Sequence, residues 1–431
     1  MFRNCTEEQT AKASIWYISK YLAPPGPKSV GGRGFSIMRE IAARGYPVTV
    51  FTSDANHLAT PPRFRGLFHV QHLDGVPVVW VRGVKYRSVR SFRRVISWCQ
   101  FEASILFLPH SRFARPDVIV ASSLSLLSVF SAFLLSRKYR ARFIFEVRDI
   151  WPLTITEEGG FNPRNPFVRM LAHVERFGYE KADVIVGTMP NLEAHVRKVS
   201  KATAPVVCIP MGFDHCDSIH NPMQHSDSRP VWASDEKFII GYAGSIGATN
   251  ALDVLFECAV SLRDNPKLHF VVMGDGDLLA SYVDSYSHLE NITFTGRIPK
   301  QDVPAALALC DVLYLSTFDS EVWNYGQSLN KLIDYMLAGK PVVASYSGFP
   351  SMLNESRAGI FVPAGDSARL ASAIQELSEM GESVLVEMGA RGRHWLLSNR
   401  SYSTLAKDYL NLVVDRHGSA SNIGLSGQSE D

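Results

Sequence analysis

Short, wholly apolar segments alternate with amphipathic helical patterns along most of this chain, and that alternation limits its fold more than any other feature. Segments such as DVIVA (117–121) and DVIVG (183–187) are apolar at consecutive positions rather than at every second one. A strand of this kind has both faces buried, as in a parallel sheet that helices cover on each side. The pattern therefore predicts an α/β fold of the doubly wound type.

The alternation runs through the chain twice. In the first half we expect strands at 14–18, 47–52, 77–82, 117–121, 142–146, 183–187 and 206–210, with helices that include 34–45 and 167–182. In the second half we expect strands at 238–243, 268–273, 291–294, 312–315, 341–344 and 360–362, with helices at 251–263, 277–286, 302–309, 328–338 and 366–380. Ligands of such sheets bind at the carboxyl ends of the strands, so a central cleft between two sheets is the expected site.

A polar segment separates the two halves. Residues 213–236 contain two prolines and no hydrophobic period, so we place a domain linker there. The predicted domains are then 1–212 and 237–400, which suits a chain of 431 residues. A last helical region at about 387–416 has a break near 398–401, and we expect residues 401–416 to return to the first domain. Residues 417–431 have the composition of a disordered tail.

Charge and cysteine content exclude several classes of function. The formal net charge is only +2 and no nucleic-acid recognition motif is present, so we expect no nucleic acid as a partner. The six cysteines are scattered without a C-x-x-C pair, which fits a reducing compartment better than a disulfide framework or a zinc site. The N-terminus has no apolar run suited to a signal peptide, and the serine-rich apolar residues 118–136 fit a strand and a helix better than a membrane span.

The loop after the first strand carries closely spaced glycines. Gly31, Gly32 and Gly34 would let backbone N–H groups approach a ligand just before a helix begins. Their spacing is G-G-x-G and not the G-x-G-x-x-G of dinucleotide-binding proteins, which disfavours an oxidoreductase. A tight turn without a ligand is the alternative, but three prolines make the loop longer than a turn needs. We therefore expect Gly31 and Gly32 to contact a ligand.

A charged trio follows the predicted strand at 142–146. Glu146, Arg148 and Asp149 would lie at its carboxyl end and face the cleft. For Glu146, an ion pair that ties neighbouring loops is an equally good interpretation. Asp149 is followed by Ile-Trp-Pro, and we interpret it as a reacting or hydroxyl-binding carboxylate.

The segment NYGQSLNKLIDYM (324–336) begins as a glycine-containing loop and continues as a helix. A helix start exposes unpaired N–H groups and a partial positive charge, and Lys331 adds a full positive charge. Asp334 adds an acceptor for hydroxyl groups. An ordinary surface lysine is the alternative, but the helix terminus makes an anion the better partner. This segment therefore predicts a site for a phosphate and a sugar.

Two further turns follow predicted strands of the second half. Asp275 and Asp277 could hold a divalent cation, but an aspartate there also caps the following helix, and we expect the cap and no metal. Arg297 and Ile298, after Gly296, could present backbone groups to a planar base. Arg297 could equally be a solvated surface charge.

The segment 84–108 is basic and amphipathic. It contains Arg87, Arg90, Arg93 and Arg94, with apolar residues between them and no acidic residue among them. Such a segment suits an anionic membrane surface, where each cation contributes about 1 kcal/mol. A solvated helix face is the alternative. We expect these four arginines to dock the protein on a membrane.

Taken in order, these segments resemble the retaining, nucleotide-sugar-dependent glycosyltransferases of family four, also described as glycosyl transferases group 1. The motifs that carry the resemblance are WYISKYLAPPGPKSVGGRGF, FEVRDIWP, VVCIPMGFD, GYAGSIGATNALDVL, VVMGDGD, TGRIPK and SLNKLIDYMLAGKPVVAS. Within the family, the chain looks most like bacterial O-antigen, capsule and exopolysaccharide enzymes. The resemblance covers nearly the whole chain and implies the GT-B fold, in which two Rossmann-like domains face a central cleft.

The resemblance implies a role for each matching residue. The first domain would bind the acceptor, and its Gly31–Gly32 loop would lie near the donor diphosphate. In the second domain, Arg297 and Ile298 would lie by the base, Asp334 would hold the ribose hydroxyls, and Lys331 would take the diphosphate. The candidate catalytic residues are Arg148, Asp149 and Lys331, and the other candidate substrate-binding residues are Gly244, Asn324, Tyr325, Gly326, Gln327, Ser328 and Asn330.

One departure from the family pattern concerns the donor sugar. Relatives commonly carry two glutamates separated by seven residues, and here the first falls on Gly326 and the second on Asp334. An aspartate still accepts hydrogen bonds from hydroxyls, but Gly326 leaves the sugar without one usual carboxylate. Glu321, Asn324 or Gln327 could replace it.

A second departure concerns the diphosphate. The arginine and lysine that many relatives carry in one loop fall on Ser245 and Asn250, and a first-domain histidine falls on Arg148. The resemblance therefore implies that Lys331 and Arg148 share the neutralisation of the diphosphate.

The sequence thus predicts a metal-independent glycosyltransferase without a cofactor. It would move a sugar from a nucleoside diphosphate to a polyprenyl-diphosphate-linked saccharide in cell-surface polysaccharide or lipopolysaccharide biosynthesis. UDP is the nucleoside diphosphate that we expect. The predicted location is peripheral, on the cytoplasmic face of the cytoplasmic membrane.

Two alternatives share the architecture. A UDP-sugar isomerase or epimerase would convert free nucleotide sugar, and a non-catalytic scaffold in a polysaccharide assembly complex would tolerate the loss of Lys331 and Asp334.

Overall fold

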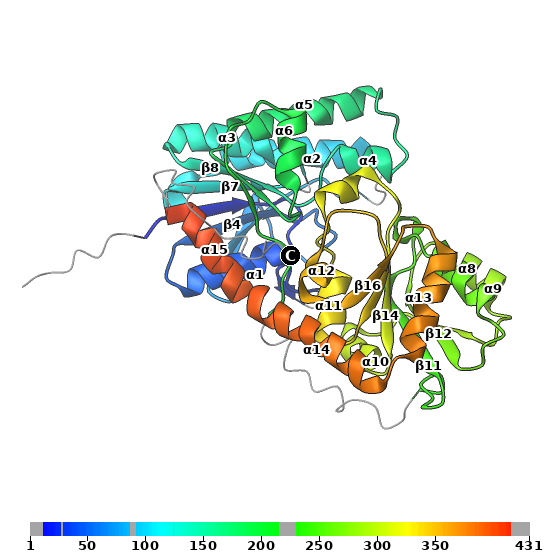
Figure 1. The fold of residues 1–431 in the computed structure, drawn as a ribbon. Helices are drawn as coiled ribbons and strands as arrows, with labels where there is room; N and C mark the ends of the chain where they lie inside the picture. The colour runs from blue at the N-terminus through cyan, green and yellow to red at the C-terminus, as the bar shows by residue number, and fades with distance from the viewer. Residues whose placement is uncertain (1–11, 27–28, 87–91, 124, 215–229, 415–431) are drawn as a thin grey trace, which may run out of the picture.

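Two separate β-sheets organise the chain, and helices cover both faces of each sheet (Figure 1). The structure is a computed structural model that describes residues 12–26, 29–86, 92–123, 125–214 and 230–414. The two-sheet α/β architecture confirms the predicted fold class of two doubly wound, Rossmann-like domains.

The first sheet has the strand order β10-β9-β8-β7-β1-β4-β6-β5. Its strands are β1 (Ile15–Ile18), β4 (Val48–Ser53), β5 (Phe68–Leu73), β6 (Val76–Val81), β7 (Val118–Ser122), β8 (Arg142–Val147), β9 (Val184–Gly187) and β10 (Val206–Cys208). β5 pairs antiparallel with β6, and the other neighbours pair in parallel. A small antiparallel pair, β2 (Pro25–Gly26) and β3 (Ser29–Val30), precedes the first helix. The helices are α1 (Arg33–Ala43), α2 (Phe92–Phe107), α3 (Ser128–Tyr139), α4 (Leu153–Glu157), α5 (Pro166–Lys181) and α6 (Leu192–Val199), with a short 3-10 helix η1 (His110–Arg112).

The second sheet has the order β13-β12-β11-β14-β15-β16, and all its neighbours pair in parallel. Its strands are β11 (Phe238–Ser245), β12 (Leu268–Asp275), β13 (Ile292–Gly296), β14 (Val312–Ser316), β15 (Val342–Ser345) and β16 (Gly359–Val362). The helices of this domain are α8 (Asp253–Ser261), α9 (Leu279–Tyr286), α10 (Val303–Ala308), α11 (Asn330–Leu337), α12 (Met352–Ser356), α13 (Ser367–Glu379) and α14 (Glu382–Asn399). The last helix, α15 (Tyr402–Val414), packs on the first domain. Three short 3-10 helices complete the list: η2 (Ala248–Asn250), η3 (Lys300–Asp302) and η4 (Glu321–Tyr325).

The consecutive apolar residues of the strands place buried side chains on both faces of the sheet. In β1, Ile15 and Tyr17 belong to the core under α1 and α15, while Trp16 and Ile18 belong to the core under α2, α3, α5 and α6. Side chains alternate across a strand, so only a strand that is apolar at every position can fill two cores. This is the physical reason that the sequence pattern identified the fold class.

The predicted strands all occur, with ends displaced by a residue or two. β5 was not predicted. Its sequence FHVQHL mixes polar and apolar residues, because β5 is an antiparallel edge strand whose residues are half-buried or exposed. An edge strand of this kind lacks the apolar run that marks the buried parallel strands.

The chain crosses between the two domains at two places. Most of the first crossing, the predicted linker 213–236, lies outside the described residues, as does the predicted tail 417–431. The second crossing is the junction of α14 with α15, at Arg400 and Ser401. Helix α15 then lies along α1 of the first domain (Figure 1), with Leu405, Tyr409 and Val413 in the same core as α1.

In the described part of the chain, no helix combines the length and the apolar character needed to cross a bilayer.

The burial of α15 predicts a stability effect in the first domain. Leu405 is 2% exposed, so Leu405→Ala should lower the free energy of unfolding by about 2–5 kcal/mol, through lost burial and the cavity left behind. Val414 on the same helix is 54% exposed, so Val414→Ala should change the free energy of unfolding by less than about 0.5 kcal/mol. Denaturant unfolding measures both variants. Equal stability of Leu405→Ala and Val414→Ala would contradict the docking of α15.

Candidate functional site

A cavity of about 700 Å³ opens at the carboxyl ends of β11, β12 and β13. Six of the predicted site residues line it together: Gly244, Arg297, Ile298, Asn330, Lys331 and Asp334. Its volume lies in the range of small-molecule and cofactor sites. The cavity therefore gathers the second-domain candidates in one place, at the sheet edge where ligands of parallel sheets bind.

A close approach of the carboxyl ends of β11 and β12 lies at this cavity. Gly274, at the end of β12, has a φ of +154°, and a Cβ there would lie 1.8 Å from the carbonyl oxygen of Gly244. A side chain at position 274 would therefore push the carboxyl ends of β11 and β12 apart. The glycines of VVMGDGD serve this packing. Asp275 lines the cavity, and its Oδ1 accepts a hydrogen bond from the Gly276 N–H at 2.8 Å.

Helix α11 presents its N-terminus to the cavity. Asn330 and Lys331 of its first turn line the wall, and no side chain caps the helix at Leu329. The hydroxyl of Tyr335 accepts from the Ala243 N–H at 2.9 Å and donates to the Ala243 carbonyl at 3.2 Å. These two bonds fix α11 against β11, so its N-terminal partial charge has a fixed direction.

Lys331 places a cation beside this helix start. Its Nζ donates to Asn250 Oδ1 at 2.7 Å and to the Tyr242 hydroxyl at 3.1 Å, and it lies 4.8 Å from the centre of the Tyr242 ring. Among the described residues, no carboxylate forms an ion pair with it. Burial lowers the pKa of Lys331 to about 8. A cation held by neutral partners in a cavity is a favourable partner for an anion.

The contact with Asn250 accounts for one departure from the family pattern. The resemblance implies a basic residue in many relatives at the position of Asn250, and in this structure Asn250 orients the lysine of α11. The positive charge therefore reaches the loop after β11 from α11. The sequence showed that the loop lacked a cation. It did not show that Lys331 supplies the cation, because that depends on the packing of α11 against β11.

The first-domain candidates do not line this cavity. Both carboxylate oxygens of Asp149 are engaged within its own loop, by Trp151 Nε1 at 2.9 Å and by Thr154 Oγ1 at 2.6 Å. Arg148 follows β8 and is held through its backbone by Ser123 and Thr188. The catalytic roles of Arg148 and Asp149 stay predictions.

Gly31 and Gly32 lie just before α1, and they too lie outside the cavity wall. Gly31 has a φ of +106°, which favours glycine, and Gly32 is the N-cap of α1. Both are half-buried. Their contact with a ligand stays a prediction.

Glu146 is part of a buried ion pair and does not face the cleft. Its Oε2 lies 2.9 Å from Arg33 Nη1, both side chains are fully buried, and Tyr17 and Ser122 donate to its Oε1 at 2.6 and 2.7 Å. Burial alone would raise the pKa of Glu146, but Arg33 and the hydroxyl donors outweigh burial and lower it. Of the two interpretations left open by the sequence, the structure shows the ion pair.

The loop before α11 packs against the first domain. Asn191 donates from its backbone N–H to the Tyr325 carbonyl and from its Nδ2 to the Asn324 carbonyl, both at 3.0 Å. Ser328 Oγ accepts from the Met211 N–H at 2.8 Å. The predicted site residues Asn324, Tyr325, Gly326, Gln327 and Ser328 therefore lie in the seam between the domains, and none of them lines the cavity.

The same seam accounts for the missing family glutamate. Gly326 has a φ of +98°, and a Cβ there would lie 2.4 Å from Cδ of Pro190 in the first domain. A glutamate at this position is incompatible with that contact. Glu321, one suggested replacement, is paired with Lys198 of the first domain and accepts from the Tyr325 hydroxyl. Glu321 is therefore part of the domain contact.

Glu158 was missed by the sequence analysis. Burial, and next the nearby Asp149, raise the pKa of Glu158 to about 7, and the nearby indole of Trp323 from the second domain acts in the opposite direction. No sequence pattern marks this residue, because its environment arises only when η4 approaches α4. Among the described residues, no group of three or more His, Cys, Asp or Glu side chains is arranged to hold a metal ion.

Comparisons with known families match both domains. The family described as "Glycosyl transferase 4-like domain" matches residues 35–212, and the family described as "Glycosyl transferases group 1" matches residues 237–380. The two matches together cover about three quarters of the chain. The chain therefore belongs to the family-four, group 1 glycosyltransferases.

Individual relatives are distant. The chain is 28% identical over 167 residues to 2-deoxystreptamine glucosyltransferase of Streptomyces kanamyceticus, which covers 37% of this chain and 40% of the relative. It is 28% identical over 206 residues to the GDP-mannose-dependent alpha-(1-6)-phosphatidylinositol monomannoside mannosyltransferase of Mycobacterium tuberculosis. That match covers 46% of this chain and 53% of the relative. The matched region thus spans about half or less of each of these relatives.

Solved structures share the fold. Sucrose-phosphate synthase of Thermosynechococcus elongatus superposes with a TM-score of 0.69 at 19% identity, covering 93% of this chain and 98% of that one. HepE of Anabaena, in complex with UDP and glucose, superposes with a TM-score of 0.61 at 15% identity. The superposition covers 93% of this chain and 99% of HepE. These likenesses establish the GT-B fold.

The lowered pKa of Lys331 predicts the pH dependence of nucleotide binding. A lysine carries its charge below its pKa, so UDP affinity should be steady from pH 7 to about 8 and fall above it, by up to roughly tenfold for each pH unit. Calorimetric titration of UDP at several pH values measures this.

The control variants separate Lys331 from other lysines. Lys331→Met should weaken UDP binding at neutral pH and remove the alkaline fall, whereas Lys267→Met, at an exposed lysine before β12, should behave as the parent protein. A dissociation constant of the parent protein that is unchanged up to about pH 9.5 would refute the role of Lys331.

Proposed function

We propose that this chain is a retaining, metal-independent glycosyltransferase that moves a sugar from UDP to a polyprenyl-diphosphate-linked saccharide. Its proposed setting is cell-surface polysaccharide biosynthesis at the cytoplasmic face of the cytoplasmic membrane. The observation that carries the proposal is the convergence of Lys331 and the uncapped N-terminus of α11 on one cavity. Family membership supports the reaction class.

The chemistry follows from where the charge lies. As the bond between the anomeric carbon and the diphosphate oxygen breaks, negative charge grows on the leaving diphosphate. Lys331 and the N–H groups of α11 stabilise that growing charge more than they stabilise the intact donor, and this difference accelerates the reaction. Asp334, on the cavity wall, accepts hydrogen bonds from the ribose hydroxyls, and Arg297 with Ile298 lies beside the base.

The acceptor oxygen attacks from the face that the leaving group vacates. Its new bond to the anomeric carbon replaces the bond to the diphosphate, and its proton passes to a diphosphate oxygen. Configuration is retained, and the step needs neither a metal ion nor a cofactor. The Gly31–Gly32 loop and the loop of Arg148 and Asp149, at the carboxyl edge of the first sheet, bring the acceptor to the cleft.

UDP is the proposed nucleotide, and GDP is the alternative. HepE, which shares the fold, is in complex with UDP and glucose, whereas the M. tuberculosis relative is named as GDP-mannose-dependent. A thermal-shift screen of nucleotides and nucleotide sugars distinguishes the two, because a ligand that binds the native state raises the melting temperature by mass action.

Lys331→Ala should lower sugar transfer by about 10²–10³-fold while the protein stays folded, because the growing diphosphate charge loses its cation. Release of UDP from the donor selected by the screen measures the rate, and the melting temperature reports the fold. Lys267→Ala is the matched control.

Other outcomes identify the alternatives. A folded Lys331→Ala protein with the turnover of the parent would show that Lys331 has no part in transfer. Conversion of free UDP-sugar without any lipid acceptor would identify an isomerase or epimerase. Full function in vivo of both Lys331→Ala and Asp334→Ala would identify a scaffold.

The start of α2 supports docking on a membrane surface. Phe92 is 75% exposed and Ile96 is 42% exposed, and Arg93 lies between them on the first turns of the helix. The guanidinium of Arg94 lies 5.0 Å from the centre of the Trp98 ring. Arg87 and Arg90 lie outside the described residues. Exposed apolar residues beside cations suit the interface of an anionic bilayer.

Replacing Arg90, Arg93 and Arg94 with glutamate should release the protein from anionic liposomes, because about 1 kcal/mol of attraction per cation becomes repulsion. Co-sedimentation with phosphatidylglycerol-containing vesicles measures this. The same charge change at Arg263, Lys267 and Arg369 of the second domain is the control and should leave binding intact. Equal sedimentation of the two triple variants would refute docking through α2.

A further inference from the structure

The two chain crossings between the domains are bonded to each other. The Phe213 N–H donates to the Arg400 carbonyl at 3.2 Å, and the Tyr402 N–H donates to the Phe213 carbonyl at 3.0 Å. A Cβ at Gly212 would lie 2.3 Å from the Arg400 carbonyl oxygen, so the two backbones are in direct contact. We call residues 209–214 and 400–402 the hinge, because a movement of one domain against the other passes through both segments.

Arg33 joins this hinge to the first sheet. Its Nε donates to the carbonyls of Ile209 and Pro210 at 3.1 and 3.0 Å, and its Nη2 donates to Ile209 at 2.6 Å. Its Nη1 lies 2.9 Å from Glu146 Oε2 on β8. One fully buried guanidinium therefore holds the hinge backbone with one edge and the sheet with the other.

The surroundings leave this pair no freedom to move. Tyr17 donates to Glu146, and a Cβ at Gly34 would lie only 2.4 Å from the Tyr17 hydroxyl. Arg33 is also the first residue of α1 and directly follows Gly31 and Gly32. A planar guanidinium satisfies several acceptors only in a fixed geometry, so a displacement of the hinge displaces the glycine loop with it.

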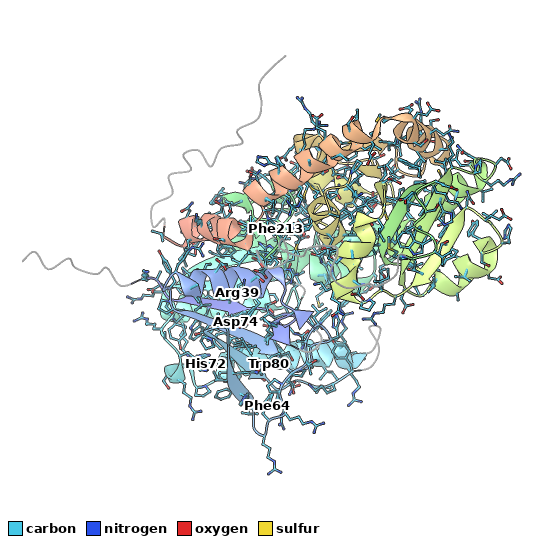
Figure 2. All side chains as sticks on the ribbon, turned by 90° about the horizontal axis from the view of Figure 1, so that it is seen from below. Arg39, Phe64, His72, Asp74, Trp80 and Phe213 are labelled. Carbon is cyan, nitrogen blue, oxygen red and sulfur yellow. The ribbon has the colours of Figure 1, made fainter. Side chains whose placement is uncertain are left out.

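A second, partly exposed layer repeats the connection. Ser36 Oγ donates to Asp214 Oδ2 at 3.2 Å, and Arg39 of the same helix is paired with Asp214. Arg39 Nη1 also lies 4.0 Å from Asp74. Figure 2 shows Phe213 beside α15, and then Arg39 and Asp74 in succession into the first domain.

We propose that Arg33 and Glu146 are positioning residues that couple the Gly31–Gly32 loop to the hinge, so that closure of the domains sets the position of the loop. The effect on turnover rests on the proposed function, in which this loop lies near the diphosphate and the acceptor. Nucleotide binding itself does not depend on the coupling, because the cavity is lined by second-domain residues.

Two variants separate coupling from simple stability. Arg33→Lys keeps the buried charge and removes the fork that reaches both the hinge and Glu146. The double variant Arg33→Met with Glu146→Gln replaces the ion pair by neutral groups of similar size, an exchange that buried pairs often tolerate. Glu102→Gln is the matched control. Glu102 is also a buried carboxylate of the first domain, but it belongs to α2 on the opposite face of the sheet and accepts from Ser128 and Ser131.

Hydrogen–deuterium exchange of the full chain tests the coupling without any substrate. We expect exchange to rise together in residues 31–36 and 209–214 in Arg33→Lys and in the double variant, and in neither segment in Glu102→Gln. A rise in only one of the two segments, or in neither, overturns the proposal. If the double variant does not fold, the exchange of Arg33→Lys alone decides whether the two segments are coupled. Arg39→Gln, in the partly exposed layer, should give a smaller rise in exchange in the same two segments.

Kinetics with UDP-glucose as the probe donor test the consequence for turnover. We expect kcat to fall about tenfold in Arg33→Lys, with KM for the donor and the dissociation constant of UDP within about twofold of the parent. A kcat within about twofold of the parent in a folded variant overturns the role in turnover. If the parent turns over neither UDP-glucose nor any other nucleotide sugar of the screen, the proposed function fails, and the exchange measurement still decides the coupling.

Discussion

All strands of the second sheet run in the same direction, and the rest of the molecule depends on that constraint. Parallel strands deliver every strand-to-helix loop to one edge, so residues far apart in sequence, such as Gly244, Arg297 and Lys331, meet in one cavity. The same geometry in the first sheet brings the glycine loop and the loop after β8 to a common edge. Two such edges, joined at a hinge, give a two-domain site without any long-range motif in the sequence.

Two of the departures that the resemblance implies, at Asn250 and at Gly326, coincide with specific packing contacts. The cation beside the loop after β11 comes from Lys331 on α11, held by Asn250 and Tyr242. At position 326, where the resemblance implies a glutamate in relatives, a Cβ would clash with Pro190 of the first domain. The loop that precedes α11 therefore contributes to the contact between domains, and electrostatic stabilisation of a diphosphate is concentrated at the helix start.

Much of this could be predicted from the sequence, and the reason is local. Consecutive apolar residues mark strands buried on both faces, and a turn between a strand and a helix marks the sheet edge where the cavity lies. Lys331 and Asp334 were therefore found as a pair on one helix start. β5 was missed because an edge strand lacks that apolar run, and Glu158 was missed because its raised pKa depends on the approach of the second domain. The partner of Glu146, more than a hundred residues away, likewise follows only from the fold.

In the proposed function, Lys331 and the N-terminus of α11 bind the diphosphate of a nucleotide in the cavity of the second domain. A crystal structure of the protein with UDP bound tests it most directly. We expect diphosphate oxygens within hydrogen-bonding distance of Lys331 Nζ and of the first N–H groups of α11, with the ribose at Asp334. Nucleotide density at any other place, with Lys331 still bonded only to Asn250 and Tyr242, would contradict it.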